Sequence, residues 1–405
     1  MAKTLLIVSG GIEAADAAKR AKEMGLYVVV SDRDPEAPGF AFADSRLIAD
    51  VYGATETAAA ADRYSRKIRK IDGVICVAAD APLTAATVAS RLGIPGISLA
   101  AAELASDKLA MKRRFVERGV PAPWFEEVHT PQELQRTAIA RGGPLVVKPA
   151  DSRGSRGVQR VNATADLAQA FAMARKHSPT QRVMVEDYLE GPQVSTESIV
   201  IDGVCVTPGF SDRNYEFLDV YAPYFVENGG DLPSRLPEQT QEQVRDVVAR
   251  AAAALGVSNG TVKGDIVVHD GQPYVIELAA RLSGGFFCTR EIPLSTGVDF
   301  VGCAIRLALG EPVSPAELTP KFSTAVVQRY AFPNPGRVVQ IQGAEEARGV
   351  TGIAEVVVTA KAGDVIPPAG DRRPSAAMVL ATGQSREIAL ASANQALSKL
   401  RIRTA

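Results

Sequence analysis

The sequence has few of the residues that form structural metal sites or disulfides. Its 405 residues include four cysteines and three histidines, and no two of the cysteines form a CxxC pair. We therefore expect neither a zinc site nor a disulfide framework. A chain of this length buries enough apolar surface to fold without either one.

The sequence also lacks an excess of charge and a long apolar run. Its 45 Lys and Arg residues balance 46 Asp and Glu residues, so a general attraction to nucleic acid or anionic membranes is not expected. No run approaches the roughly 18 apolar residues of a membrane helix, and the run Leu5–Val8 is too short for a signal peptide. We expect a cytoplasmic protein with no nucleic-acid or membrane partner.

Three domains are predicted from the strand and helix patterns. Strand patterns alternate with helical ones in residues 1–105, which favours a parallel sheet covered by helices. In residues 106–310 the turn signals Asp202-Gly203 and Asp270-Gly271 each separate two strand patterns, which predicts hairpins and a mainly antiparallel α+β domain. Residues 311–405 contain two strand patterns and a closing helix, which predict a smaller α+β domain.

A loop of small residues follows a predicted strand that ends near Lys148. The loop includes Ser152, Gly154, Ser155 and Gly157, whose small size lets backbone N–H groups approach an anion such as a nucleotide phosphate. It is not a Walker A sequence, because no Lys-Ser/Thr follows the glycines. A mobile surface loop is the alternative interpretation.

Two acidic residues, Asp265 and Glu277, stand on the two strands of the second predicted hairpin. Carboxylates on paired strands can face the same side, and their hard oxygens suit Mg²⁺ that bridges nucleotide phosphates. Glu277 lies between Ile276 and Leu278, where an ionised group needs a cation or hydrogen-bond donors. Two ordinary solvent-facing positions are the alternative.

Several further residues are candidates for substrate or nucleotide contacts. Arg281 follows Glu277 by four residues and precedes the flexible segment Ser283-Gly284-Gly285. The strand end at Glu186 could accept a hydrogen bond from a purine amine, although alone it is an ordinary strand end. Arg213 and Tyr215, in the long connection between the hairpins, and Arg290 could bind a small polar substrate. A structured covering loop and a solvated arginine are the respective alternatives.

The order of these features resembles the ATP-grasp superfamily of carboxylate–amine ligases. The matching residues are Lys108, Lys148 with its loop, Glu186–Leu189, Asp265, Glu277 and Arg281. The first hundred residues resemble the Rossmann-like pre-ATP-grasp domain of that superfamily. The tail resembles the C-terminal domain of its biotin carboxylase and phosphoribosylaminoimidazole carboxylase members. The resemblance implies an ATP-grasp fold of mixed α/β and α+β type.

The resemblance also implies roles for individual residues, with ATP and Mg²⁺, or Mn²⁺ in its place, as the bound groups. Lys108 and Lys148 would bind the α- and β-phosphates, and the Ser152–Gly157 loop would cover the β- and γ-phosphates. Asp265 and Glu277 would hold Mg²⁺. Arg281, with Lys148, would stabilise the transferred phosphoryl group or bind the substrate carboxylate next to Ser283 and Gly284. The residues implied for adenine and ribose are Val146, Glu186, Asp187, Leu189, Gln193 and Ile276.

Two positions depart from the superfamily pattern. Gln193 stands where relatives commonly have an acidic residue that contacts the ribose, and Ala279 stands where many have an asparagine that binds the metal. The run Glu277–Arg281 reads Glu-x-Ala-Ala-Arg, which is found in some dipeptide ligases of the superfamily. This run favours substrates that resemble amino acids.

The leading hypothesis is a ligase that joins a small carboxylic or amino acid to an amine through an acyl phosphate and releases ADP and phosphate. The first alternative is a purine-biosynthesis enzyme that combines a ribonucleotide amine with bicarbonate, formate or glycine. A Rossmann oxidoreductase, suggested by Gly10-Gly11 and Asp32, lacks a complete GxGxxG. A regulator without catalysis is supported by Ala279 alone. Relatives are often homodimers, so a homodimer is a further expectation.

Overall fold

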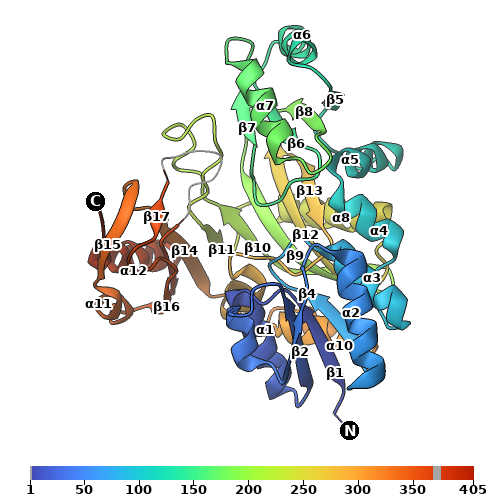
Figure 1. The fold of residues 1–405 in the computed structure, drawn as a ribbon. Helices are drawn as coiled ribbons and strands as arrows, with labels where there is room; N and C mark the ends of the chain where they lie inside the picture. Colours follow the sequence, from blue (N-terminus) through green and yellow to red (C-terminus); the bar gives the residue numbers. More distant parts are fainter. Residues whose placement is uncertain (1, 368–374) are drawn as a thin grey trace. The chain divides into compact units, whose positions relative to one another are not determined.

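The computed structural model describes residues 2–367 and 375–405 (Figure 1). The chain divides into two compact units, and two of the boundaries between them fall within the strands β9 (Gln193–Ile201) and β10 (Val204–Arg213). Unit 1 comprises Met1–Ala122, Ser195–Phe210 and Leu236–Phe322, and unit 2 comprises Pro123–Val194, Ser211–Arg235 and Ser323–Ala405. The division into domains at residues 105 and 310 stays a prediction.

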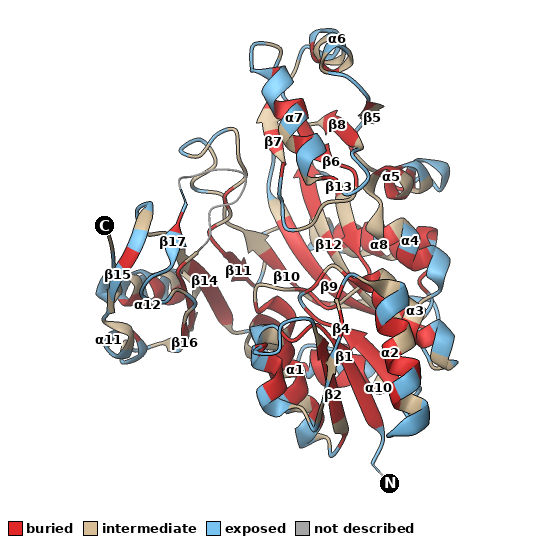
Figure 2. Cartoon of the chain, in the orientation of Figure 1, coloured by how far each residue is buried: buried red, intermediate tan, exposed pale blue. Residues whose placement is uncertain are grey.

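A four-stranded parallel sheet opens unit 1, as the alternating pattern predicts. Its order is β3-β2-β1-β4, with β1 at Thr4–Val8, β2 at Tyr27–Asp32, β3 at Ser45–Ile48 and β4 at Gly73–Cys76. The helices of this part are α1 (Ile12–Glu23), α2 (Ala54–Lys67) and α3 (Pro82–Leu92). Residues of α2 and α3 join Leu6, Val29 and Val74 of the strands in one buried cluster. The strands are mostly buried, whereas the outer sides of these helices are exposed (Figure 2).

The rest of unit 1 is built around the second predicted hairpin. Strands β12 (Gly260–His269) and β13 (Gln272–Ala279) are antiparallel, and Asp270 and Gly271 between them have φ of 48° and 76°. Asp202 and Gly203 turn in the same way between β9 and β10. Positive φ at both central residues is the geometry of a type I′ turn. The accompanying helices are α4 (Leu99–Ser106), α5 (Lys108–Glu117), α8 (Glu238–Leu255), α9 (Ile292–Thr296) and α10 (Phe300–Ala308).

Unit 2 contains an antiparallel sheet of order β5-β8-β6-β7. Its strands are Phe125–Val128 (β5), Leu145–Pro149 (β6), Gln159–Val161 (β7) and Val183–Asp187 (β8), and its helices are α6 (Pro131–Arg141) and α7 (Leu167–His177). Leu145, Val147, Val183 and Val185 pack with both helices in one buried cluster. The alternate residues of β6 and β8 therefore face away from the helices.

The C-terminal part of unit 2 is α+β, as predicted. Its elements are β14 (Ala325–Ala331), β15 (Gly336–Gln342), α11 (Ala344–Arg348), β16 (Ile353–Val358), β17 (Val365–Ile366), β18 (Ala377–Gly383), α12 (Arg386–Lys399) and β19 (Arg401–Thr404). Helix α12 packs Ala389, Ala393 and Ala396 against buried residues of these strands. Strand β11 (Gly230–Leu232) pairs with β14, and its Asp231 forms a buried ion pair with Arg329. Across both described ranges, no helix is apolar and long enough to span a bilayer.

Candidate active site

A β-bulge in the second hairpin places Asp265 directly opposite Glu277. From the turn to the pair of Ile266 and Val275 the strands are in regular register, but the next pair is Asp265 with Glu277, so Ile276 is the extra residue. Without the bulge, Asp265 would stand opposite Ile276, and Glu277 would point to the other face. The bulge therefore creates the pair of carboxylates that the sequence predicts.

Each of these carboxylates has a lysine beside it. Lys108 Nζ, on the first turn of α5, lies 3.0 Å from Glu277 Oε1. Lys263 precedes Asp265 by two residues on the same face of β12 and forms an ion pair with it, and Ser195 Oγ lies 3.1 Å from the same carboxylate. Two hard, anionic oxygen donors side by side fit Mg²⁺. Among the residues described, no group of three or more His, Cys, Asp or Glu could hold a metal ion.

Arg281 is held by an acidic residue that the sequence analysis missed. Its guanidinium Nε and Nη2 lie 2.8 and 2.5 Å from Asp80 Oδ1, just beyond β4. Burial acts most strongly on the pKa of Asp80 and raises it, but the charge and hydrogen bond of Arg281, together with the charges of Lys108 and Lys263, outweigh burial and lower this pKa. Arg281, Lys108 and Lys263 therefore all act on Asp80. The two lysines are the same ones that pair with Glu277 and Asp265.

Two carboxylates, those of the buried Glu197 and the half-buried Glu13, hold the segment after Arg281. Glu197 of β9 accepts the Ser283 N–H at 3.1 Å, and Glu13 of α1 accepts the Gly285 and Phe286 N–H groups at 3.0 and 2.7 Å. Burial raises the pKa of each carboxyl to about 7. The predicted substrate segment at Ser283 and Gly284 is therefore fixed from two sides, by residues that the sequence analysis did not select.

Replacing Glu197 with glutamine is expected to reduce the loss of stability between pH 5 and pH 8. The pKa of Glu197 is about 7 in the folded state against 4.5 without burial, so the folded chain holds this proton more tightly. That contribution is complete below pH 4.5 and is lost as the pH rises through about 7; it amounts to at most ~3 kcal/mol. Tm measured at both pH values should therefore fall less for Glu197→Gln than for the parent chain.

Glu242→Gln, on the exposed side of α8, is the matched control for Glu197→Gln and should keep the parent pH dependence. Equal falls in Tm for the parent and Glu197→Gln would show that Glu197 is not protonated in the folded chain near neutral pH.

In unit 2, one face of the β6–β8 pair combines an apolar surface with an ion pair. Val146 stands opposite Glu186, and Lys148 stands opposite Met184, so these four side chains share the face that points away from α6 and α7. Lys148 Nζ lies 2.5 Å from Glu186 Oε1, and both side chains are buried. The sheet thus brings together the predicted phosphate-binding lysine and the predicted adenine-binding glutamate.

The predicted loop between β6 and β7 is tightly curved. Gly154, Ser155 and Gly157 all have positive φ, of 62°, 58° and 73°. A Cβ on Gly157 would lie 3.2 Å from His177, so a larger residue is doubly disfavoured there. The start of the loop is anchored by Asp151, which accepts the Thr180 hydroxyl hydrogen bond at 2.7 Å, whereas Gly154–Arg156 are exposed. Ser152 is half-buried and lies between Asp151 and the exposed residues Gly154–Arg156.

The segment after Glu186 is placed by its neighbours. Asp187 forms an ion pair with Arg141, and its N–H donates to Trp124 O at 2.9 Å, while the Tyr188 N–H donates to Pro144 O. Among the described residues, no other backbone group hydrogen-bonds the Leu189 backbone. Gln193 begins β9 and is half-buried. Leu189 is thus the position of this segment whose backbone could bind a purine edge.

The remaining substrate candidates already have partners within their own units. In unit 2, Arg213 forms an ion pair with Glu227 and lies 5.8 Å from the Tyr215 ring. In unit 1, Arg290 makes two contacts with Asp16 of α1, at 2.8 and 3.0 Å. It lies in a π-helical turn, Phe287–Glu291. A substrate carboxylate would have to compete with these pairs.

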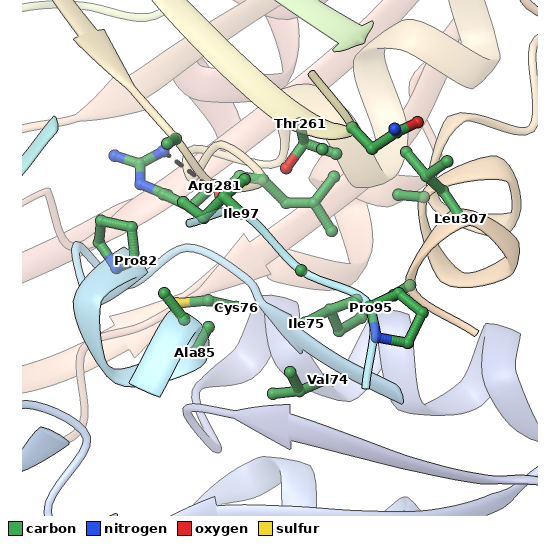
Figure 3. Close-up of a pocket in the computed structure, with 18 residues that line it drawn as sticks. Val74, Ile75, Cys76, Pro82, Ala85, Pro95, Ile97, Thr261, Arg281 and Leu307 are labelled. Carbon is green, nitrogen blue, oxygen red and sulfur yellow. Dashed lines mark hydrogen bonds between the residues drawn. The ribbon is translucent and has the colours of Figure 1, made fainter. Parts of the chain in front are cut away.

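An apolar cavity of about 90 Å³ lies behind Arg281 in unit 1. Figure 3 shows Arg281 at one end and Pro95 and Leu307 at the other. Cys76 lines it, and burial raises the pKa of its thiol to about 12, so the thiol stays protonated. The lining includes no carboxylate and only one cation, so the cavity does not provide the donors that a nucleotide requires.

The residues missed by the sequence analysis are Glu13, Asp80, Glu197 and Lys263. Two of them, Asp80 and Lys263, could have been predicted from their positions in the sequence. Asp80 follows a parallel strand at its carboxyl end, where ligand-binding residues collect, and Lys263 precedes Asp265 by two residues, which is the spacing of one strand face.

Comparison with known proteins connects this geometry to a family. A model of the ATP-grasp domain matches residues 105–285, and a model of the L-amino acid ligase C-terminal domain 2 matches residues 329–405. D-alanine–D-alanine ligase of Gloeobacter violaceus is 32% identical over 224 residues, which cover 52% of this chain and 70% of that protein. An uncharacterized protein of Sinorhizobium fredii is 26% identical over 399 residues, which cover 96% of this chain and 80% of that one.

The same fold occurs in a solved structure. The crystal structure of L-amino acid ligase from Bacillus licheniformis matches with a TM-score of 0.84 at 22% identity, over 100% of this chain and 99% of that chain.

Proposed function

Because this chain belongs to the ATP-grasp family of ligases and has the ATP-grasp fold, we propose that it joins an amino acid to an amine through an acyl phosphate. The observation that carries this proposal is the bulged pair of Asp265 and Glu277, with a lysine beside each carboxylate and Arg281 close by. The family forms C–N bonds, and the L-amino acid ligase model at residues 329–405 supports an amino-acid substrate.

ATP binding is proposed for the β6–β8 face of unit 2. Glu186 accepts a hydrogen bond from the adenine amine, the Leu189 backbone pairs with the ring edge, and Val146 packs on the ring. Lys148 neutralises phosphate oxygens, and the Ser152–Gly157 loop donates N–H groups to them. Ile276 and Gln193 are proposed to contact the ring and the ribose, and an amide can hydrogen-bond the ribose hydroxyls.

Asp265 and Glu277 are the residues that would hold Mg²⁺, which neutralises phosphate charge when it is bound. Lys108 acts on the same phosphates from the first turn of α5. Ala279 has no side-chain oxygen, so phosphate oxygens or water would complete the coordination. These charges stabilise the negative oxygens of the transferred phosphoryl group, because their positions are fixed before the reaction begins.

The reaction is proposed to take place in two steps. A carboxylate oxygen of the acid attacks the γ-phosphorus, and the bond to the β,γ-bridging oxygen breaks to release ADP. The amine then attacks the acyl carbon, the acyl phosphate loses inorganic phosphate, and the amine nitrogen gives up a proton. Arg281 is proposed to bind the acid or the transferred group, next to the Ser283 and Gly284 segment that Glu13 and Glu197 hold. Arg290, Arg213 and Tyr215 remain candidates for contacts with the rest of the substrates.

A hydroxylamine screen tests this proposal. The chain is incubated with ATP, Mg²⁺ and hydroxylamine, and one amino acid or other small carboxylic acid is added in each well. We expect an acyl hydroxamate and ADP in equal amounts for the accepted acid, because hydroxylamine intercepts an acyl phosphate. ADP formation that depends on an acid but yields no hydroxamate would contradict the acyl phosphate. The same screen with a panel of amines then identifies the second substrate.

A further inference from the structure

The bulged hairpin presents a two-by-two patch of side chains on one face. Asp265 stands opposite Glu277, and two residues further on Lys263 stands opposite Ala279. Lys263 forms an ion pair with Asp265, and Lys108 forms one with Glu277 at 3.0 Å. The patch therefore carries two carboxylates and two ammonium groups, and its charge is balanced without any bound ion.

A divalent cation that approaches this patch alone meets two unfavourable conditions. It is repelled by two ammonium groups close to its ligands, at distances where charges interact strongly. It also finds only two carboxylates, because the described part of the chain offers no group of three or more metal-binding side chains. A nucleotide changes both conditions, since its phosphates attract the ammonium groups and supply further oxygen ligands.

We propose that Lys263 stays ion-paired with Asp265, and Lys108 with Glu277, until a nucleotide binds. The two lysines then move to the phosphate oxygens of the nucleotide, so that the metal binds only together with the nucleotide. This inference rests on the proposed function, because it takes the hairpin to be the Mg²⁺ and phosphate site. Lys263 thereby acts as a positioning residue that sets the order of binding. Its charge, beside Asp265, keeps the metal out of the site while no nucleotide is bound.

The test is a Mn²⁺ titration of the whole chain, in which binding is measured as the loss of the electron paramagnetic resonance signal of free Mn²⁺. The parent chain should bind no Mn²⁺ tightly by itself and should bind it once a non-hydrolysable ATP analogue is present below the enzyme concentration. Lys263→Met should bind Mn²⁺ without nucleotide at least about tenfold more tightly than the parent, because one repelling charge is gone. Lys263→Arg, which keeps the charge, should behave like the parent.

Lys70→Met is the matched control, because it removes the same charge from an exposed lysine that pairs with Asp72; it should leave Mn²⁺ binding unchanged. Tight Mn²⁺ binding by the nucleotide-free parent, or equal affinities of the parent and Lys263→Met, would overturn the inference. If Lys263→Met does not fold, Lys263→Gln, which also lacks the charge, takes its place, and the Mn²⁺ bound by the same nucleotide concentration without protein is subtracted in every titration. Failure of the parent to bind the ATP analogue would instead contradict the proposed function.

Discussion

Replacing Glu277 with glutamine is expected to lower ATP turnover by about 100-fold and to raise the Mg²⁺ concentration needed for half of the maximal rate. Glutamine keeps the shape of the side chain, so the hairpin and its bulge should persist. It removes one anionic oxygen ligand and the ion pair with Lys108 at 3.0 Å. Metal binding and phosphoryl transfer should therefore weaken together, because the same carboxylate is proposed to serve both.

The measurement for Glu277→Gln is the initial rate of ADP release across a Mg²⁺ titration. Glu242→Gln on the surface of α8 loses the same charge and should match the parent at every metal concentration. A Mg²⁺ dependence of Glu277→Gln that coincides with that of the parent would remove Glu277 from the proposed metal site.

Replacing Lys148 with methionine is expected to reduce ATP turnover by at least about 100-fold and to lower Tm as well. The loss of turnover follows from the missing phosphate contact. The loss of stability has a different cause, because Glu186 would keep a buried charge whose lysine partner at 2.5 Å is gone. Breaking a buried ion pair in this way costs about 3–5 kcal/mol.

The double variant Lys148→Met with Glu186→Gln separates these two effects. It removes both charges of the buried pair, and such a replacement is often nearly neutral for stability. We expect its Tm to return toward that of the parent, while its ATP turnover stays as low as that of Lys148→Met. Recovery of turnover together with Tm would mean that Lys148 has only a structural role.

The turns and strands that carry the site could be predicted from the sequence, because local chemistry determines them. Asp270-Gly271 tolerates the positive φ of a type I′ turn, and the turn fixes which strands pair. The Rossmann-like alternation at the start of the chain also predicts its parallel sheet. The strand at Ser45–Ile48 was missed, since it has only four residues, of which two are exposed.

The details of the site depend on contacts between distant residues, which leave no local signal. The bulge at Ile276 is what brings Glu277 opposite Asp265, and a hairpin with its regular register would have pointed Glu277 the other way. Arg281 and Arg290 were predicted as substrate-binding residues from their types. Their acidic partners, Asp80 and Asp16, are 201 and 274 residues away in the sequence.

Oxygen-18 in the carboxylate of the accepted acid tests the proposed acyl phosphate most directly. The acid is labelled at both carboxylate oxygens and incubated with the chain, ATP, Mg²⁺ and the amine, and the released phosphate is examined by mass spectrometry. We predict one labelled oxygen in each phosphate and one in each amide product, because the carboxylate oxygen that attacks the γ-phosphorus leaves with it. Phosphate that carries no label, while labelled amide is formed, would contradict phosphorylation of the acid.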